Sequence, residues 1–303
     1  MERENINEER KKIAELISEV ENSPFDLSPE TVSILAGAEA KAPVIGVTGP
    51  AGVGKSTFIA SLLDRIKNKF SKIAVIMIDP SSSYSEGAFL GDRIRMKRHY
   101  SDESIFIRSM ATRGARGGTA RGLLSVIRIF NHFRYDLVIV ETAGVGQDEI
   151  DIRSSADLVL LLLAPGAGDE IQVLKSGYME IADYYLINRV EADGANELLR
   201  SVRDNITSVT PGRKVYGISA LSGAGMDELS GDLAGRLASY SDNGDREARY
   251  SVNELLGLLG QYIETRYSDI PFLKKEIELV CGGKSGSYAS FERIKKLLTG
   301  GGG

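Results

Sequence analysis

The chain has 303 residues, with 37 lysines and arginines against 42 aspartates and glutamates, which gives a formal charge of −5. This acidic balance excludes a general electrostatic attraction to nucleic acid or to an anionic membrane. The single cysteine, Cys281, and the lack of a long apolar run predict a cytoplasmic protein without disulfides or membrane spans. We therefore expect neither nucleic acid nor a membrane as a partner.

Residues 1–42 predict a helical N-terminal extension. Four apolar residues recur at the spacing of one helix face, namely Ile13, Leu16, Ile17 and Val20. A second, shorter helix is expected to begin at Pro29, with Ser28 as its N-cap, and to end at Gly37. The extension is therefore expected to contribute two helices.

Between residues 43 and 219, short β-rich apolar runs alternate with longer mixed segments, which predicts a mainly parallel sheet covered by helices. The predicted strands are residues 44–48, 73–78, 105–107, 137–140, 158–163, 184–187 and 215–218. The run 158–163 is too apolar for a half-exposed strand, so we expect it in the middle of the sheet. Its predicted neighbours are the strands 44–48 and 137–140.

The polar stretch 241–246 predicts a linker, and a helical region follows it. Apolar residues recur there at helical spacing, namely Val252, Leu255, Leu256, Leu259 and Ile263. The expected organisation is a helical extension over 1–42, an α/β domain over 43–240 and a helical region over 241–303. This last region could pack on the α/β domain or form a subunit interface, and periodicity alone does not decide between them.

A glycine-rich motif of the form G-x-x-x-x-G-K-[ST] follows the first predicted strand. It consists of Gly49, Pro50, Ala51, Gly52, Val53, Gly54, Lys55, Ser56 and Thr57. Its glycines let backbone N–H groups face a phosphate chain, and the helix that follows adds partial positive charge. We expect Lys55 to reach the β- and γ-phosphates and Ser56 to ligate Mg²⁺. The fold class is therefore predicted to be an α/β P-loop NTPase.

Carboxylates that hold the metal are expected at the carboxyl ends of neighbouring strands. Glu141 and Asp79 each follow a predicted strand, and Asp92 is a third candidate if its loop folds back. The alternative for each is a carboxylate that caps the next loop or helix. Gln147 lies on the glycine-containing loop behind Glu141 and is expected to position the attacking water.

A base-reading motif is expected after strand 184–187, where GTPases typically carry Asn-Lys-x-Asp. This chain has Asn188, Arg189 and Glu191 there, so a carboxylate that can accept from guanine N1 and N2 is kept, on a side chain one methylene longer. A second base-contacting loop is expected downstream, formed by Ser219, Ala220 and Leu221. The backbone N–H of Ala220 would be available to the guanine carbonyl. The alternative interpretation is that this stretch is a loop unrelated to base recognition.

Together these motifs resemble the methylmalonyl-CoA mutase-associated GTPase family, the MeaB/ArgK group of P-loop GTPases. Besides the phosphate loop, the resemblance rests on residues 79–82, 91–96, 108–114, 141–147, 165–172 and 179–183. It implies a homodimeric, Mg²⁺-dependent GTPase with GTP and GDP as ligands. It also implies a chaperone of the adenosylcobalamin-dependent methylmalonyl-CoA mutase, which gates cofactor loading and protects the holoenzyme. Residues 43–240 would be the GTPase domain and 241–303 the dimerisation region.

By the same resemblance, Asp79, Asp92 and Glu141 would lie in two nucleotide-sensing switch loops around Mg²⁺. Residues 166–175 would form a third switch that couples the nucleotide state to the mutase. The coupling residues would be Asp169, Glu170, Gln172 and Lys175. The glycines in this stretch allow the loop to change conformation, and its charged residues can change the groups they pair with. The alternative interpretation is a solvated helix N-terminus.

Two positions depart from the family pattern, because Glu191 replaces Asp and Ala143 replaces the more usual Val. A small-molecule kinase or ATPase of the arginine/ornithine transport type would share the phosphate loop, but the two base-reading stretches would have no role in it. A nickel-delivering GTPase would need clustered cysteines and histidines, and this chain has one cysteine and two histidines.

Overall fold

The structure is a computed structural model that describes residues 2–37, 42–79, 96, 98–111, 122–144, 152–166, 178–209, 213–240, 245–282 and 284–298. Several predicted site residues lie outside these ranges, namely Asp92, Gln147, Asp169, Glu170, Gln172 and Lys175. The chain divides into two compact units, Met1–Ser251 and Val252–Gly303. Each unit is described by itself. The functional division at residues 42 and 240 stays a prediction.

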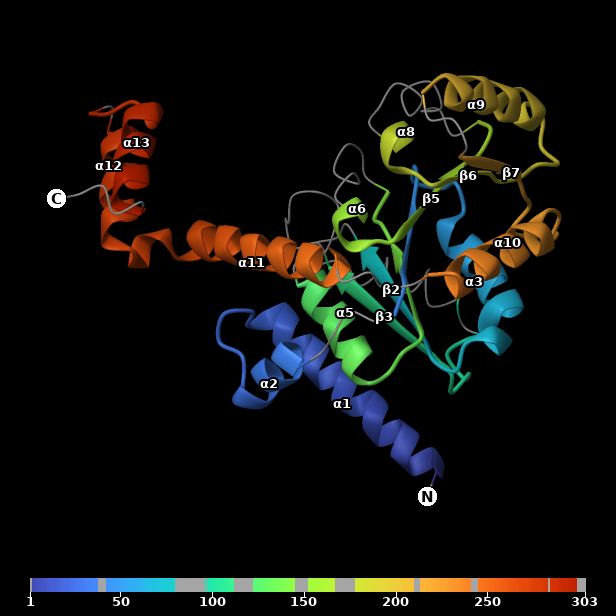
Figure 1. Ribbon diagram of the computed structural model, residues 1–303, viewed down its shortest axis with the longest axis horizontal. Helices are drawn as coiled ribbons and strands as arrows, with labels where there is room; N and C mark the ends of the chain where they lie inside the picture. Colours follow the sequence, from blue (N-terminus) through green and yellow to red (C-terminus); the bar gives the residue numbers. More distant parts are fainter. Residues whose placement is uncertain are drawn as a thin grey trace. The chain divides into compact units, whose positions relative to one another are not determined.

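The centre of the first unit is a seven-stranded sheet with the order β3-β2-β4-β1-β5-β6-β7 (Figure 1). The strands are β1 (Val44–Thr48), β2 (Ile73–Asp79), β3 (Ile105–Ala111), β4 (Leu137–Glu141), β5 (Leu158–Leu163), β6 (Tyr184–Ile187) and β7 (Lys214–Gly217). Every neighbouring pair is parallel. The predicted α/β fold with a mainly parallel sheet is therefore confirmed.

Strand β5 is buried along its whole length, as its apolar sequence predicts. It pairs with β1 on one side and with β6 on the other. The expectation that β5 also adjoins β4 is wrong, because β4 pairs with the opposite edge of β1. A strand has two edges, and those of β1 are taken by β4 and β5, so β1 occupies the centre of the sheet.

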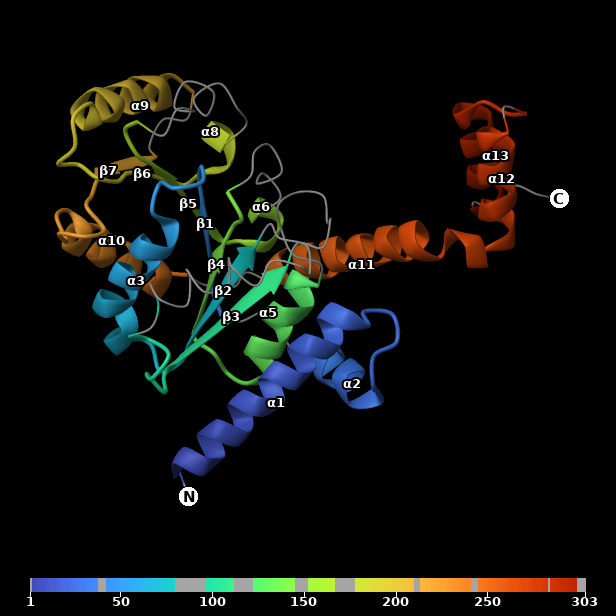
Figure 2. The ribbon, with the colours of Figure 1, turned by 180° about the vertical axis from the view of Figure 1, so that it is seen from behind.

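Helices cover both faces of the sheet (Figures 1 and 2). One face packs against α1 (Glu2–Asn22), α2 (Pro29–Gly37), α5 (Leu123–His132), α6 (Ile152–Ser155) and α9 (Ala195–Val209). The other face packs against α3 (Lys55–Ile66) and α10 (Met226–Ala238). Two short helices, η1 (Lys67–Lys69) and α8 (Tyr178–Ile181), complete the helical elements described in this unit. The sheet is thus the middle layer of three.

The predicted N-terminal helices are both present. The apolar stripe of α1 is buried in the core beside α5, as its spacing predicts. At the start of α2, the Thr31 N–H donates to the Ser28 hydroxyl over 3.3 Å, so Ser28 caps the helix as expected. Pro29 is the first helical residue and Gly37 the last.

Helix α6 contacts β1 on one side and the start of α11 (Asp245–Arg266) on the other. A Cβ on Gly46, in the middle of β1, would lie 2.5 Å from Cγ1 of Ile152, so only glycine allows this close approach. At the other side of α6, the buried Tyr250 hydroxyl donates to the backbone carbonyl of Ser155. Tyr250, near the start of α11, is therefore part of the first unit's core.

The second unit contains the rest of α11, followed by η3 (Tyr267–Asp269), α12 (Pro271–Cys281) and α13 (Ser287–Leu298). Helices α12 and α13 are joined by the Arg293 guanidinium, which donates to both carboxylate oxygens of Glu276. The predicted helical region is confirmed, but α11 begins at Asp245, inside the stretch expected to be a linker. None of the helices in the described ranges is long and apolar enough to cross a membrane.

Candidate functional site

The parallel sheet brings the predicted motifs to one edge, because all its strands end on the same side. The phosphate loop follows β1, Asp79 ends β2 and Glu141 ends β4. Asn188 follows β6, and the loop that begins at Ser219 follows β7. Residues that are far apart in the sequence therefore line one site.

The phosphate loop runs from β1 into the first turn of α3. Gly49 has a φ of 140°, and a Cβ there would collide with the backbone carbonyl oxygen of Leu162, so this position requires glycine. The buried Lys55 amine donates to the carbonyl of Gly49 over 2.7 Å and to that of Pro50 over 3.2 Å. The lysine charge is thus held inside the loop that would surround the phosphates.

The expected metal ligands Ser56 and Glu141 are in direct contact, since the Ser56 hydroxyl donates to a Glu141 carboxylate oxygen over 2.7 Å. Both side chains are buried, and so is Asp79. The three line one cavity of about 330 Å³ together with Lys55; we call it the phosphate cavity. One hydroxyl and two carboxylates are the oxygen donors that Mg²⁺ prefers, so these residues fit this cation.

The donors present would not enclose a metal ion by themselves. Within the described ranges, no group of three or more His, Cys, Asp or Glu side chains could hold one. Mg²⁺ is usually bound through one or two carboxylates plus substrate phosphates and water. The phosphate cavity agrees with that mode, in which the nucleotide supplies part of the coordination.

The two base-reading stretches meet at Asn188. Its side-chain amide donates to the carbonyl of Val53 in the phosphate loop over 2.8 Å, and its oxygen accepts the Ala220 N–H over 3.0 Å. The Ala220 N–H, which we expected to face a guanine carbonyl, is therefore directed at Asn188 in this structure. The Ser219 hydroxyl donates to Glu191 over 3.0 Å and so orients the carboxylate expected to read the base. Leu221 is 87% exposed.

A second, larger cavity of about 820 Å³ adjoins the phosphate cavity. Its walls are the outward face of α3, Arg98 and the loop from Ala220 to Gly223. Thr57 lines both cavities. The two spaces therefore adjoin at Thr57. The larger one borders the loop after β7, whereas Asn188 and Glu191 are not among its lining residues.

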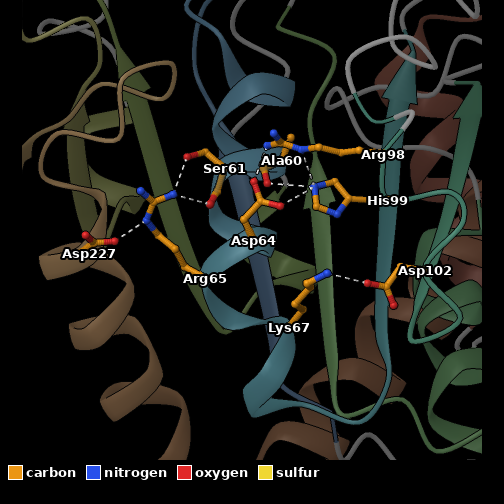
Figure 3. A network of polar contacts seen from close by, with 9 residues as sticks. All are labelled: Ala60, Ser61, Asp64, Arg65, Lys67, Arg98, His99, Asp102 and Asp227. Carbon is orange, nitrogen blue, oxygen red and sulfur yellow. Dashed lines mark hydrogen bonds and ion pairs between the residues drawn. The ribbon is translucent and has the colours of Figure 1, made fainter.

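The outward face of α3 and the adjoining η1 are held by polar contacts with the turn before β3 and with α10 (Figure 3). The ion pairs are Arg98 with Asp64 at 2.5 Å, Arg65 with Asp227 at 2.6 Å and Lys67 with Asp102 at 2.9 Å. The Ser104 hydroxyl and Lys67 both donate to Asp102 and lower the pKa of its carboxyl to about 2. These contacts fix the helix that carries the phosphate loop.

The buried His99 lies beside the Arg98–Asp64 ion pair. Its Nε2 is 3.1 Å from the carbonyl oxygen of Ala60 and 3.5 Å from the Asp64 carboxylate, with Arg98 and Lys67 also nearby (Figure 3). Burial lowers the pKa of the imidazole and outweighs the opposite effects of Asp64 and Ala60. His99 is therefore neutral at pH 7.

The sequence motifs did not predict the contact that Arg189 makes with the phosphate loop. Its guanidinium donates to the carbonyl of Gly52 over 2.7 Å, and it lines the phosphate cavity. Its φ of 59° lies in the left-handed region, which arginine seldom adopts. The sequence indicates that Arg189 belongs to the site only through its position directly after Asn188. The residue type gives no indication of this backbone conformation.

A parallel sheet with a phosphate loop after its central strand and acidic residues at neighbouring strand ends defines a P-loop nucleotide-binding protein. Within this class the chain belongs to the family described as methylmalonyl Co-A mutase-associated GTPase MeaB, which matches residues 13–264. The family expected from the sequence motifs is thereby confirmed.

Two relatives illustrate the range of this similarity. A protein of Pyrococcus abyssi named as a GTPase is 43% identical over 188 residues, which cover 62% of this chain and 58% of that protein. A fused isobutyryl-CoA mutase of Cupriavidus metallidurans is 38% identical over 246 residues, which cover 76% of this chain and 22% of the relative. The chain spans less than two thirds of the length of either relative.

Among solved structures, one described as a LAO/AO transport system kinase matches with a TM-score of 0.60 and 22% identity. The match covers 98% of this chain and 97% of the other. At this level of identity, the similarity shows that the fold is shared and carries no argument about activity.

We expect a fall in pH from about 7 to about 5.5 to destabilise the fold through His99. Its pKa is lowered in the folded state, so the unfolded chain, with a pKa near 6.5, takes up the proton first. The stability supplied by neutral His99 is present above about pH 6.5 and is lost as the pH falls below it, by at most about 1.4 kcal/mol per pH unit.

Denaturant unfolding at both pH values checks this expectation. His99→Gln should flatten the pH dependence of the free energy of unfolding. The control is His132→Gln, which removes the other imidazole of the chain. A His99→Gln protein with the pH dependence of the wild type would show that His99 does not carry the effect.

Proposed function

We propose that this protein binds and hydrolyses GTP with Mg²⁺ and serves as a chaperone of an adenosylcobalamin-dependent methylmalonyl-CoA mutase. The observation that carries the proposal is the meeting of the phosphate loop, the Ser56–Glu141 pair and the two base-reading stretches at one edge of the sheet. Membership of a family described as mutase-associated GTPases supports it.

In the proposed reaction, Lys55 and the loop N–H groups bind the β- and γ-phosphates of GTP. Ser56, Asp79 and Glu141 would hold Mg²⁺, which when bound neutralises charge that develops on the phosphates. Gln147 is proposed to position the attacking water. We propose slow turnover by the protein alone and faster turnover with the mutase.

The proposed partner follows from the relatives. One of them is named a fused isobutyryl-CoA mutase, and the segment similar to this chain makes up 22% of it. A related GTPase segment therefore occurs within a protein named as an acyl-CoA mutase. We propose that residues 166–175, through Asp169, Glu170, Gln172 and Lys175, couple the nucleotide state to the mutase and so gate cofactor loading and protect the holoenzyme.

The alternative function, that of a small-molecule kinase or ATPase, has less support. The structure resembles one described as a transport system kinase, but that similarity concerns the fold alone. Asn188 joins the stretch after β6 to both the phosphate loop and the loop after β7. This arrangement serves recognition of a nucleotide base and has no evident use in binding a phosphate acceptor.

We also propose that the protein is a homodimer joined through α11. Five large apolar side chains on this helix are between 45% and 62% exposed, namely Val252, Leu255, Leu256, Leu259 and Ile263. They follow the spacing of one helix face, and exposed apolar faces of this kind mark protein interfaces. A second copy of the helix would cover them.

Lys55→Ala should abolish tight GTP binding and, with it, hydrolysis stimulated by the mutase. The variant loses charge-assisted hydrogen bonds to the β- and γ-phosphates, which together contribute at least about 3 kcal/mol, or a factor of about 100 in affinity. Calorimetry with GTP and Mg²⁺ and phosphate release with and without methylmalonyl-CoA mutase measure both effects. The control is Lys69→Ala on exposed η1. A wild type whose hydrolysis is unchanged by the mutase would contradict the chaperone role.

Wild type should prefer GTP over ATP, and Glu191→Asp should widen the preference. Guanine presents two donors to a carboxylate, whereas adenine presents an acceptor at N1 and leaves the carboxylate unpaired. The Glu191 carboxylate, to which Ser219 donates, lies one methylene farther from the backbone than an Asp carboxylate would, so we expect its distance to guanine to be less favourable. Competition binding of both nucleotides checks this, with Glu197→Asp on α9 as the control. Equal affinity of the wild type for GTP and ATP would exclude guanine recognition.

Leu256→Glu should convert a wild-type dimer into a monomer, because a carboxylate placed in an apolar interface loses its hydration. Light scattering coupled to size-exclusion chromatography measures the mass. Val32→Glu is the control, since Val32 is a similarly exposed apolar residue on α2. A monomeric wild type would rule out this interface.

A further inference from the structure

Two buried threonines connect the ends of β1 and β4. The Thr142 hydroxyl donates to the Thr48 hydroxyl over 3.1 Å, and both residues are at most 2% exposed. Thr48 directly precedes the phosphate loop, and Thr142 directly follows Glu141. The bond therefore links the two chain segments that carry the expected phosphate-binding and metal-binding residues.

This hydroxyl bond lies one residue beyond the paired part of the two strands. The last pair in the register of β1 with β4 is Val47 with Glu141. The backbone N–H of Thr142 then donates to the carbonyl of Val47 over 3.0 Å. The bond between the side chains of Thr142 and Thr48 continues the connection past this point, where the phosphate loop begins.

The hydroxyls at these positions are not needed to fill space. Strands β1 and β4 are buried along their whole length and consist mainly of valine, leucine and isoleucine. Valine has the shape of threonine, and replacing both partners of a buried hydrogen bond by apolar groups of the same shape is close to neutral for stability. A hydrogen bond fixes the distance and direction between its two groups, whereas an apolar contact is non-directional. What the threonine pair adds is therefore a fixed geometry.

The segment fixed in this way contacts the phosphate loop on both sides of the hydroxyl bond. Before it, Glu141 accepts the Ser56 hydroxyl over 2.7 Å. After it, Gly144 has a φ of 79°, and a Cβ there would lie 2.5 Å from Nζ of Lys55. Residues 141–144 thus lie so close to the phosphate loop that a small shift of this segment would displace the carboxylate from its partner.

We propose that Thr142 is a positioning residue for GTP hydrolysis, which through its bond to Thr48 holds Glu141 where the carboxylate can bind Mg²⁺. Thr142 acts through Glu141 and needs no contact of its own with the nucleotide. This inference rests on the proposed binding and hydrolysis of GTP. The contrasting role is that of a purely structural bond, which would change stability and leave the effect of Mg²⁺ unchanged.

The test measures the effect of Mg²⁺ separately from nucleotide binding as such. Calorimetry with the non-hydrolysable analogue GMPPNP gives its affinity in EDTA and with Mg²⁺. Thr142→Val should leave the affinity in EDTA within about twofold of wild type, and it should reduce the gain in affinity on adding Mg²⁺ about tenfold. It should also lower kcat for GTP about tenfold. Thr142→Ser, which keeps the hydroxyl, should restore both properties.

Two further variants separate positioning from stability. Thr142→Val leaves the buried Thr48 oxygen without this donor, whereas Thr48→Val/Thr142→Val removes both hydroxyls and should unfold closer to wild type. Its Mg²⁺ effect should nevertheless be as small as that of Thr142→Val, because both variants lack the same bond. Thr31→Val is the control, since Thr31 is a buried threonine on α2 that donates to Glu19 and does not line the phosphate cavity.

A Thr142→Val protein with the Mg²⁺ effect and the kcat of wild type would overturn the inference. An equal loss of GMPPNP affinity with and without Mg²⁺ would also overturn it, and so would the same Mg²⁺ defect in Thr31→Val. A wild type that neither binds GMPPNP nor hydrolyses GTP would refute the proposed function itself. If circular dichroism shows that Thr142→Val is misfolded, the comparison is made on Thr48→Val, which breaks the same bond from its other end.

Discussion

The hydrogen bond from Ser56 to Glu141 joins two residues that are 85 positions apart in the sequence. It can form because β1 and β4 are adjacent and parallel, so that the helix after one and the loop after the other start at the same edge. A hydroxyl and a carboxylate are thus held in contact inside the phosphate cavity. The order of the strands is therefore what assembles the chemistry, and the helices on both faces keep that order in place.

The sequence predicted the features that are local. The phosphate loop carries its own signature, and the apolar runs are short enough to locate the strands to within a few residues. Of the two predicted neighbours of β5, β1 was right and β4 was wrong, because an apolar run indicates burial but not which edges pair. Arg189 and Tyr250 could not be assigned their roles, since one depends on a backbone conformation and the other on a contact between residues 95 positions apart.

The base-reading side of the site is organised by the phosphate loop itself. Asn188 binds the loop through its amide and holds Ala220 through its oxygen, so one buried side chain connects three segments. Such a connection reduces the freedom that a ligand would otherwise have to remove on binding. It also means that a shift in the phosphate loop would change the position of the residues that contact the base.

The close contact at Gly46 has a consequence for how this sequence can vary. Strand β1 leaves too little volume for a methyl group beneath Ile152, whose Cγ1 would lie 2.5 Å from a Cβ on Gly46. Alanine at this position would push α6 away from the sheet and shift the carbonyl that accepts the Tyr250 hydroxyl. Added bulk at residue 46 is therefore tolerated only with a loss of bulk at residue 152, and it would also disturb the contact of Tyr250 with α6.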